Sequence, residues 1–515
     1  MHRVLRQLKH QLQGVWDLMY NCHSKKNTMK NNIKILLLLL LTLNYSCSDS
    51  LQEVNVDPNT FPSAGDAQVL SSAIGFLGYV VDTDLNYSES FLWSQYYTWG
   101  QGVSIGNSER YVAQPDDFNG YWARAYANCL ADLNAITKNS SAPAYSGIAK
   151  VLKAYLFQGL VDHFGDIPFS EALAGAIEDG SILAPSFDAA GSAVYPGLVT
   201  LLDEALSDLE RAEDGVVGEE DFIYQGDISK WIKFANSLKL RVLMRTSETD
   251  PQAAAIKELI ANGTFIETVA DMPYIPYTGA SGDQNPMFAR AEYGVGMFYF
   301  ASNATLDVLE SLDDPRGEVL YTKATTGSFA GQLHGIDQGT IKNEPFTAPP
   351  TDYSMASEYA YSETNPVILM SPWEVWFLRA EAAARYDTSD DEEMAFETAI
   401  ALNFKYMGIE DEASSYINSL NYSSSDALVD RIDQIAVQKW ISLNGTQEDE
   451  GWIEARRFDR PESRLFTNGI WQTPPLSVLP NGTFPSAWLY PESERSLNPN
   501  APAQRTITDN IFWDN

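Results

Sequence analysis

The chain has 515 residues, of which 69 are acidic and 34 are basic, and its formal net charge is −35. A hydrophobic content of 44% at this length is that of a globular protein with a large buried core, which excludes a mostly disordered chain. So acidic a surface repels phosphate backbones, and this excludes nucleic acid as an expected partner.

A short apolar run near the start is typical of a signal peptide. Residues 35–43 are almost entirely leucine and isoleucine, and two lysines precede them. A membrane-spanning helix needs about 20 apolar residues, so this run is too short to be one. We predict that residues 29–46 are a lipoprotein signal peptide. Residues 1–28 have no role in front of a signal peptide, and we interpret them as a mis-annotated upstream extension.

Cys47 directly follows the predicted signal peptide, as the lipidated first residue follows a bacterial lipoprotein signal. Asn44 and Tyr45 depart from the usual residues, so an ordinary signal with an incidental cysteine is the alternative. The "SDS" after Cys47 resembles the signal that sends lipoproteins to the cell surface in Bacteroidota. We predict lipidation at Cys47, a linker over 47–65 and a single binding domain over 66–515.

The mature chain predicted in this way carries 27 basic and 68 acidic residues, a formal charge of −41. Only two of the five histidines remain, His163 and His334. This disfavours a histidine-rich metal centre or a serine–histidine–aspartate triad. The acidic stretch 387–394 lacks the twelve-residue spacing of a calcium loop. We therefore expect neither a metal ion nor a cofactor.

Helical periodicity dominates the rest of the chain. Apolar residues recur at three- and four-residue spacing, as on one face of a helix. Ser371 and Glu374 form a capping-box pattern, and Gly408 and Gly445 are expected to end helices. The stretches predicted to be helical are 147–166, 194–214, 227–245, 371–386, 395–408 and 427–445.

The fold class follows from these elements. Long helices in successive pairs indicate helical-hairpin repeats of the tetratricopeptide type, although no clean 34-residue period is present. Between them lie long stretches rich in Pro, Gly, Asn, Tyr and Thr, at 265–300, 323–370 and 460–515. We predict a mainly α fold of tetratricopeptide-like helix pairs, with long irregular loops and a few short strands.

Residues 91–102, "FLWSQYYTWGQG", gather aromatic rings and amides without a charge. Sugars present flat patches of C–H bonds, on which rings stack, and hydroxyl groups, which amides satisfy. The alternative is a buried aromatic stripe, which has the same spacing. The predicted ligand-binding residues here are Trp93, Tyr96, Tyr97, Trp99, Gln101 and Asn107.

A second candidate cluster lies in the loop-rich stretch 274–299, far away in sequence, as in a site built from several loops. Its rings and hydrogen-bonding groups suit the same kind of ligand. The predicted ligand-binding residues here are Tyr277, Asp283, Asn285, Phe288, Arg290 and Tyr293.

Several stretches, in this order along the chain, resemble the SusD/RagB family of outer-membrane nutrient-binding lipoproteins, in its SusD-like branch. They include "YLFQGLVDHFGDIPFSEAL" at 155–173, "YQGDISKWIKFANSLKLRVLMR" at 224–245 and "MSPWEVWFLRAEAAAR" at 370–385. The others are "CSDSLQEVNVDPNTFP" (47–62), "DDPRG" (313–317), "QKWISLNG" (438–445), "EARRFDRP" (454–461) and "YPESERSLNPN" (490–500).

Most of these stretches are structural by their own chemistry. Gly165 suits a turn after a helix, and His163 is expected to be a packed histidine because no partner histidine is near. Arg456, Arg457 and Arg460 are clustered in an acidic chain, so we expect them to pair with carboxylates inside the fold.

The resemblance implies a SusD-like fold with four tetratricopeptide-like helix pairs and a lipid anchor outside the outer membrane. It also implies a SusC-like TonB-dependent transporter as partner, an oligosaccharide or peptide as ligand, and no enzymatic activity. It assigns no binding residue, because ligand contacts in the family do not follow a fixed motif. The charge of the chain favours a neutral glucan over an anionic polysaccharide.

Three alternatives remain open. A helical-toroid glycosidase would need two carboxylates about 5 to 10 Å apart, which a sequence cannot show. A peptide-binding member of the family would use the acidic surface to hold basic peptides. A plain helical-repeat scaffold would hold a partner protein without a glycan site.

Overall fold

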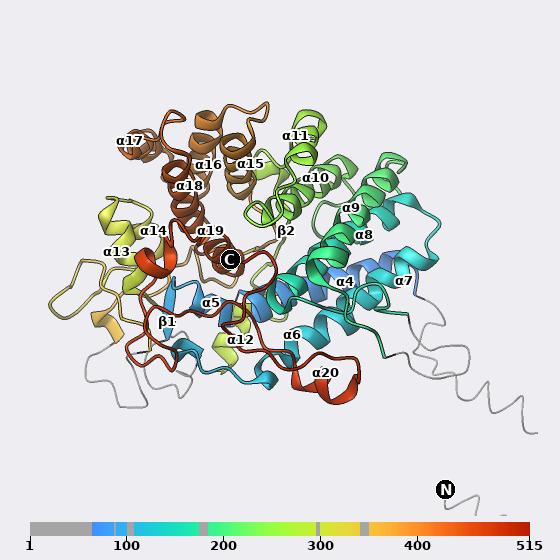
Figure 1. Cartoon of the computed structure of the whole chain (residues 1–515), viewed down its shortest axis with the longest axis horizontal. Helices are drawn as coiled ribbons and strands as arrows, with labels where there is room; N and C mark the ends of the chain where they lie inside the picture. Colours follow the sequence, from blue (N-terminus) through green and yellow to red (C-terminus); the bar gives the residue numbers. More distant parts are fainter. Residues whose placement is uncertain are drawn as a thin grey trace, which may run out of the picture. The chain divides into compact units, whose positions relative to one another are not determined.

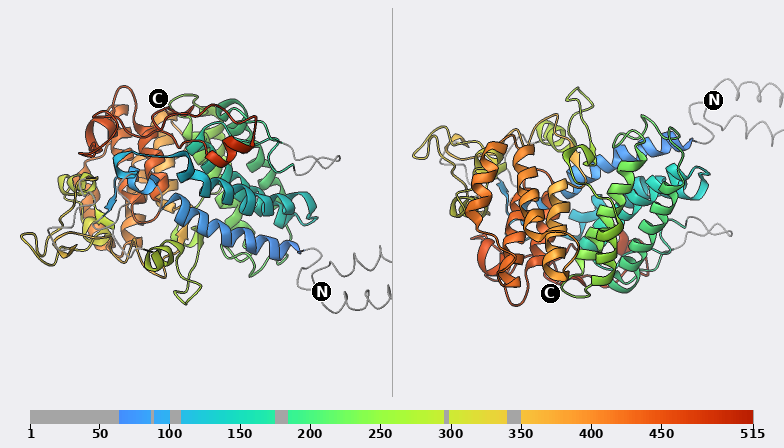
Figure 2. Two further views of the ribbon diagram at one scale, coloured as in Figure 1. Left: turned by 90° about the horizontal axis from the view of Figure 1, so that it is seen from below. Right: turned by 90° about the horizontal axis from the view of Figure 1, so that it is seen from above.

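The computed structural model describes residues 64–86, 89–99, 108–174, 184–294, 299–339 and 350–514. The chain divides into two units, Met1–Ala64 and Gly65–Asn515. The helices of the second unit pack as consecutive neighbours in a curved row, and shorter elements and long loops surround this row (Figures 1 and 2). The predicted mainly α class is confirmed.

The first part of the row runs from α7 through α8, α9 and α10 to α11, and α4 lies against α7. In Figure 1 these helices occupy the right and centre of the view. The elements of this part are α4 (Asp66–Tyr79), η1 (Val80–Leu85), α5 (Glu89–Trp93), η2 (Ser108–Arg110), η3 (Pro115–Phe118), α6 (Asn119–Arg124), η4 (Ala125–Leu130), α7 (Ala131–Asn139), α8 (Pro143–Phe164), η5 (Ala190–Val194), α9 (Tyr195–Glu210), α10 (Ile228–Arg245) and α11 (Ala253–Asn262).

The second part continues from α10 and α11 onto α15, which packs against α16 and α18; α17 lies against α16, and α19 lies against α18. The elements of this part are η6 (Val269–Asp271), α12 (Pro286–Gly294), α13 (Asn303–Ser311), α14 (Gly317–Leu320), η7 (Pro350–Asp352), α15 (Pro372–Tyr386), α16 (Glu392–Tyr406), α17 (Glu410–Leu420), α18 (Leu428–Leu443), α19 (Glu448–Phe458), η8 (Phe466–Ile470) and α20 (Glu492–Leu497). Each of the six predicted helical stretches overlaps one of these helices, although α8 and α16 begin three or four residues earlier than predicted.

Two short antiparallel ladders tie the loops to the helices. β1 (Tyr97–Trp99) pairs with β3 (Tyr299–Ala301), with Tyr97 opposite Ala301 and Trp99 opposite Tyr299. β2 (Tyr274–Ile275) pairs with β4 (Val367–Ile368). Strands this short are not stable alone, so they depend on the helices against which they pack.

The helix boundaries have local causes that the sequence contains. At the start of α15, the Ser371 hydroxyl accepts a hydrogen bond from the Glu374 backbone N–H at 3.2 Å. The Glu374 side chain does not complete the capping box, because it pairs with Arg241 at 3.3 Å. Gly408 and Gly445 follow α16 and α18 with φ of 76° and 81°, a conformation that favours glycine.

A buried network of charges joins five helices. Arg245 of α10 bonds Asp162 of α8 at 3.1 Å and Glu450 of α19 at 2.7 Å, and it also pairs with Glu454. Each of these side chains is at least 90% buried. Further bonds in this network run from Lys439 of α18 to Glu454 (2.6 Å) and from Arg457 to Glu454 (2.7 Å) and to Glu381 of α15 (2.6 Å).

The three arginines of the predicted cluster have different partners. Arg457 pairs with two carboxylates in this network, and Arg460 pairs with Asp433 at 2.6 Å, as expected. Arg456 forms no ion pair within the described residues. Its guanidinium instead donates to backbone carbonyls and lies 3.7 Å from the centre of the Trp452 ring.

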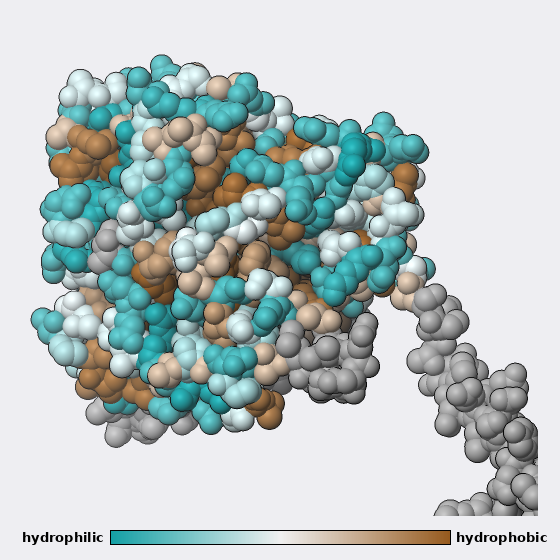
Figure 3. Space-filling model, turned by 45° about the vertical axis from the view of Figure 1, so that its right-hand side comes forward, coloured by the Kyte–Doolittle hydropathy of each residue, from teal (hydrophilic) through white to brown (hydrophobic). Residues whose placement is uncertain are grey.

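The surface mixes residue types. On the face drawn in Figure 3, hydrophobic patches alternate with hydrophilic residues. Within the residues that the structure describes, no helix combines the length and the apolar character that crossing a membrane requires.

The network predicts a large effect for the loss of one cation. We expect Arg245→Met to lower the free energy of unfolding by about 3 to 5 kcal/mol, because buried carboxylates lose their partner. Urea unfolding followed by circular dichroism measures this. Arg211→Met removes an arginine that is 65% exposed and should change the free energy by less than about 1 kcal/mol. Equal midpoints for the two variants would contradict the role given to the network.

Candidate functional site

The four aromatic rings predicted to hold a ligand at 93–99 lie in the core. The exposed fractions are 1% for Trp93, 0% for Tyr96, 1% for Tyr97 and 8% for Trp99. The segment is not one helix, because α5 ends at Trp93 and Gln95 takes a positive φ of 64° before β1 begins. This break directs the rings toward several parts of the interior.

Each ring is packed against another ring. Tyr97 stacks on Phe91 with centroids 4.8 Å apart, and Tyr96 lies 4.9 Å from Trp440. Trp93 contacts Trp452 at 5.4 Å, and Trp99 contacts Tyr299 at 5.0 Å. Their faces are therefore not available to a sugar, and the prediction that these four rings bind ligand is corrected: they fill the core. Gln101 and Asn107 lie outside the described residues.

The second predicted cluster is largely engaged in local structure. Asp283 accepts from the hydroxyl of Thr278 at 2.5 Å within its own turn. Phe288 is half-buried against Tyr361, with centroids 5.2 Å apart. Arg290 is exposed, and its guanidinium lies 3.4 Å from the backbone carbonyl of Thr83. Tyr293 belongs to α12, and its side chain lies outside the described part of the structure.

Two members of the second cluster lie close to a pocket. Asn285 precedes α12, accepts from the Phe288 N–H at 2.9 Å and donates to the Asn365 carbonyl at 3.2 Å. Tyr277 is half-buried, and its hydroxyl occupies the space next to Gly78 of α4, where a Cβ would lie only 2.4 Å away. A side chain at position 78 would displace this tyrosine.

The pocket has a volume of about 330 Å³, within the range of about 300 to 1,000 Å³ typical of small-ligand sites. We call it the acid–amide pocket. Its polar and aromatic walls come from five separate parts of the chain: Asp82, Asn285, Tyr359, Asn365, Tyr406 and Glu448. Tyr406 of α16 is half-buried, with its ring 6.0 Å from that of Tyr359. These two rings form an aromatic wall.

Both acids of the pocket have raised pKa values, so near pH 7 each is protonated in a substantial fraction of the molecules. Burial raises the pKa of Asp82 to about 7, although hydrogen bonds from the Met287 N–H and from Asn285 act to lower it. Burial raises the pKa of Glu448 to about 8, and the nearby charge of Asp82 adds to the shift. A protonated carboxyl donates as well as accepts a hydrogen bond. The pocket thus offers both kinds of partner to hydroxyl groups.

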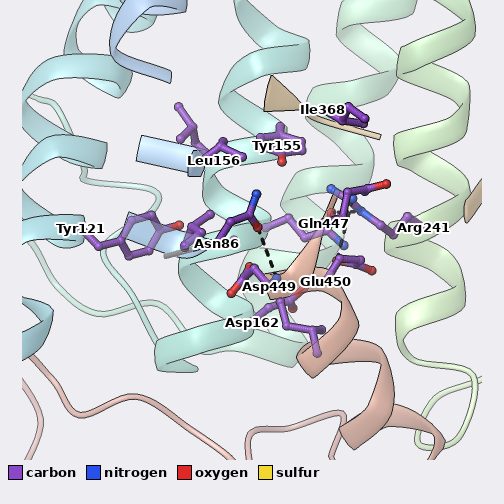
Figure 4. Close-up of a pocket in the computed structure, with 15 residues that line it drawn as sticks. Asn86, Tyr121, Tyr155, Leu156, Asp162, Arg241, Ile368, Gln447, Asp449 and Glu450 are labelled. Carbon is purple, nitrogen blue, oxygen red and sulfur yellow. Dashed lines mark hydrogen bonds and ion pairs between the residues drawn. The ribbon is translucent and has the colours of Figure 1, made fainter. Parts of the chain in front are cut away.

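A second, smaller cavity lies beside the buried charges (Figure 4). Its volume of about 30 Å³ suits water rather than a sugar. Asn86, Asp162, Arg241 and Glu450 line it, and Asn86 accepts a hydrogen bond from the Asp449 N–H at 3.3 Å. His163 is fully buried nearby and bonds Asp449 at 2.7 Å, so the prediction of a packed histidine is confirmed.

Across the described ranges, no group of three or more His, Cys, Asp or Glu side chains is placed to hold a metal ion.

Three residues of the acid–amide pocket that sequence reasoning missed are Asp82, Tyr406 and Glu448. The signal for Asp82 is its place as an acid within the apolar run of "GYVVDTDL".

The chain matches one family of known proteins over most of its length. A SusD-like family model described as "Starch-binding associating with outer membrane" matches residues 58–491. No curated protein sequence matches. Three solved structures illustrate the fold: a SusD homolog from Bacteroides uniformis (22% identity, 87% of this chain and 99% of that one, TM-score 0.69), one from Bacteroides thetaiotaomicron (19%, 88% and 99%, 0.71) and a chitin-binding SusD homolog from Flavobacterium johnsoniae (20%, 87% and 97%, 0.71).

The raised pKa of Glu448 predicts a pH dependence of stability. The folded chain holds this proton up to about pH 8, whereas the unfolded chain releases it near 4.5. The free energy of unfolding therefore falls as pH rises between these values. Glu448→Gln cannot ionise, so its stability relative to the unsubstituted chain should rise from pH 5 to pH 9 by about 1 kcal/mol or more.

Urea unfolding at both pH values measures this difference. Glu310→Gln, which replaces an exposed acid on α13, is the control and should show a pH-independent difference. A constant difference for Glu448→Gln would show that burial does not raise the pKa of this carboxyl.

Proposed function

The chain belongs to the SusD-like family of starch-binding proteins that associate with the outer membrane, and from this we propose that it captures a neutral oligosaccharide outside the cell. The acid–amide pocket is the proposed site, and a glucan is the proposed ligand class. The ligand then passes to a SusC-like TonB-dependent transporter, while a lipid on Cys47 anchors the protein to the outer membrane. The match of the family model over residues 58–491 carries this proposal.

The chemistry of the pocket supports an uncharged ligand. Amides, phenols and a protonated Glu448 provide hydrogen bonds without a fixed positive charge that could balance an anionic sugar. The chain as a whole is strongly acidic, which further disfavours uronic or sulfated polysaccharides. The half-buried Tyr406 ring is a surface on which a pyranose can stack.

The role is binding without catalysis. Asp82 and Glu448 line one pocket, as the two carboxyls of a glycosidase would. The Asp82 carboxyl, however, is already engaged by the Met287 N–H at 2.6 Å and by Asn285, so it is not free to act on a glycosidic bond. Incubation with oligosaccharides should therefore produce no new reducing ends. Their appearance would favour the glycosidase alternative.

Loss of the aromatic wall should weaken glycan binding. We expect Tyr406→Ala to lower the affinity for neutral oligosaccharides about tenfold, because the stacking ring is removed. Tyr406→Phe keeps the ring and should stay within about threefold of the unsubstituted protein. Isothermal titration calorimetry with starch-, β-glucan- and chitin-derived oligosaccharides measures both. Binding of basic peptides but of no neutral glycan would instead favour the peptide-binding alternative.

The anchor can be tested separately. Cys47→Ser removes the thiol that would carry the lipid, so we expect the variant to be lost from the membrane fraction of a Bacteroidota host. Cys22→Ser changes a cysteine in the predicted upstream extension and should leave the distribution unchanged. Cell fractionation, with protease added to intact cells, measures both anchoring and exposure. Retention of Cys47→Ser in the membrane would refute lipidation at this residue.

A further inference from the structure

Three aromatic rings form a stack at the surface, in the loop region that follows α14. The Phe329 ring lies 3.8 Å from that of His334, and His334 lies 4.8 Å from Tyr353. The planes are inclined by only 21° and 17°, so the rings are nearly parallel. Phe329 is 43% exposed, whereas most large apolar side chains of the described residues are buried. We call these three residues the ring stack.

The backbone around the ring stack is well fixed. Residues 324–332 close on themselves, because Ala324 donates to the Gln332 carbonyl at 2.9 Å and Gly331 donates to the Ala324 carbonyl at 2.8 Å. Both the side chain and the backbone of His334 are hydrogen-bonded. Its Nδ1 bonds the Asp352 carbonyl at 2.9 Å, and its backbone N–H donates to the Ser354 hydroxyl at 2.9 Å. The Phe329 ring is thus positioned before any ligand arrives.

Hydrogen-bonding side chains lie beside the rings. The Thr326 hydroxyl lies 2.7 Å from that of Thr351 and 2.5 Å from a carboxylate oxygen of Asp352. Gly327, with φ of 74°, leaves space for the Asp352 carboxyl group, since a Cβ at this position would lie 2.8 Å from the carboxyl carbon. An apolar ring face bordered by hydroxyl and carboxyl groups matches a pyranose, which has an apolar face and a polar edge.

We propose that the ring stack is a second carbohydrate-binding surface, on which the exposed Phe329 ring packs against one sugar unit of a neutral polysaccharide. This inference rests on the proposed function for the class of ligand, but it uses none of the residues of the acid–amide pocket. A polysaccharide that contacts two surfaces binds more tightly than a short oligosaccharide that contacts one.

Affinity electrophoresis of the full chain in gels containing starch or a neutral β-glucan tests the proposal. We expect Phe329→Ala to weaken retardation about fivefold, as measured by the polysaccharide concentration that halves the mobility. Phe329→Trp keeps an aromatic face and should restore retardation. Phe222→Ala is the matched control, because Phe222 has the same 43% exposure and lies outside both surfaces.

The outcomes separate the two proposals. If Phe329→Ala behaves as Phe222→Ala while Tyr406→Ala loses retardation, the ring stack is not a glycan surface and the pocket stands. If Phe329→Ala loses retardation and Tyr406→Ala does not, the ring stack stands and the pocket assignment fails. If no neutral polysaccharide retards the unsubstituted protein, the proposed function fails and the ring stack fails with it.

Discussion

The relative positions of α8, α10, α15, α18 and α19 depend on the matching of buried charges around Arg245 and Glu454. This carboxylate receives Arg245 from α10, Lys439 from α18 and Arg457 from its own helix. A buried ion without its counterion is strongly destabilising, so no helix of this group can shift without breaking a bond. Such pairing contributes less to stability than apolar packing would, but it sets the relative position of the helices. A scaffold fixed in this way can carry long loops.

The first turn of α19 shows how the same constraint bears on the pocket. Its three consecutive acids have different environments: Glu450 pairs with Arg245, Asp449 is hydrogen-bonded to His163, and Glu448 has no arginine or lysine partner within the described residues. Buried acids without a cation become neutral by a rise in pKa. Glu448 is thus a neutral hydrogen-bonding group in the wall of the acid–amide pocket, although the chain as a whole is strongly acidic.

Six of the helices, several of their ends and the family were predictable from the sequence, because periodicity and capping act over a few neighbouring residues. The helices α4, α7, α11, α17 and α19 were not among the predicted stretches. The site was not predictable, because the acid–amide pocket joins residues as distant as Asp82 and Glu448. Among the described residues, Asn285 is the one predicted ligand-binding residue that lines this pocket. The prediction for the rings at 93–99 was wrong for another reason. An aromatic segment without charge suits the core and a binding surface equally, and the turn at Gln95, which directs the rings into the interior, is not visible in the sequence pattern.

Exposure together with rigidity, rather than aromatic content, separates the rings that fill the core from the exposed ring of Phe329. Trp93, Trp440 and Trp452 are nearly sealed and stabilise the fold by apolar burial. Phe329 is partly exposed and so contributes less by apolar burial, yet backbone hydrogen bonds fix the turn on which this residue lies. A mobile loop would let this ring turn inward. A fixed turn keeps its face toward solvent and removes the entropic cost of ordering it when a ligand binds. This combination is what a binding surface requires and what core packing does not produce.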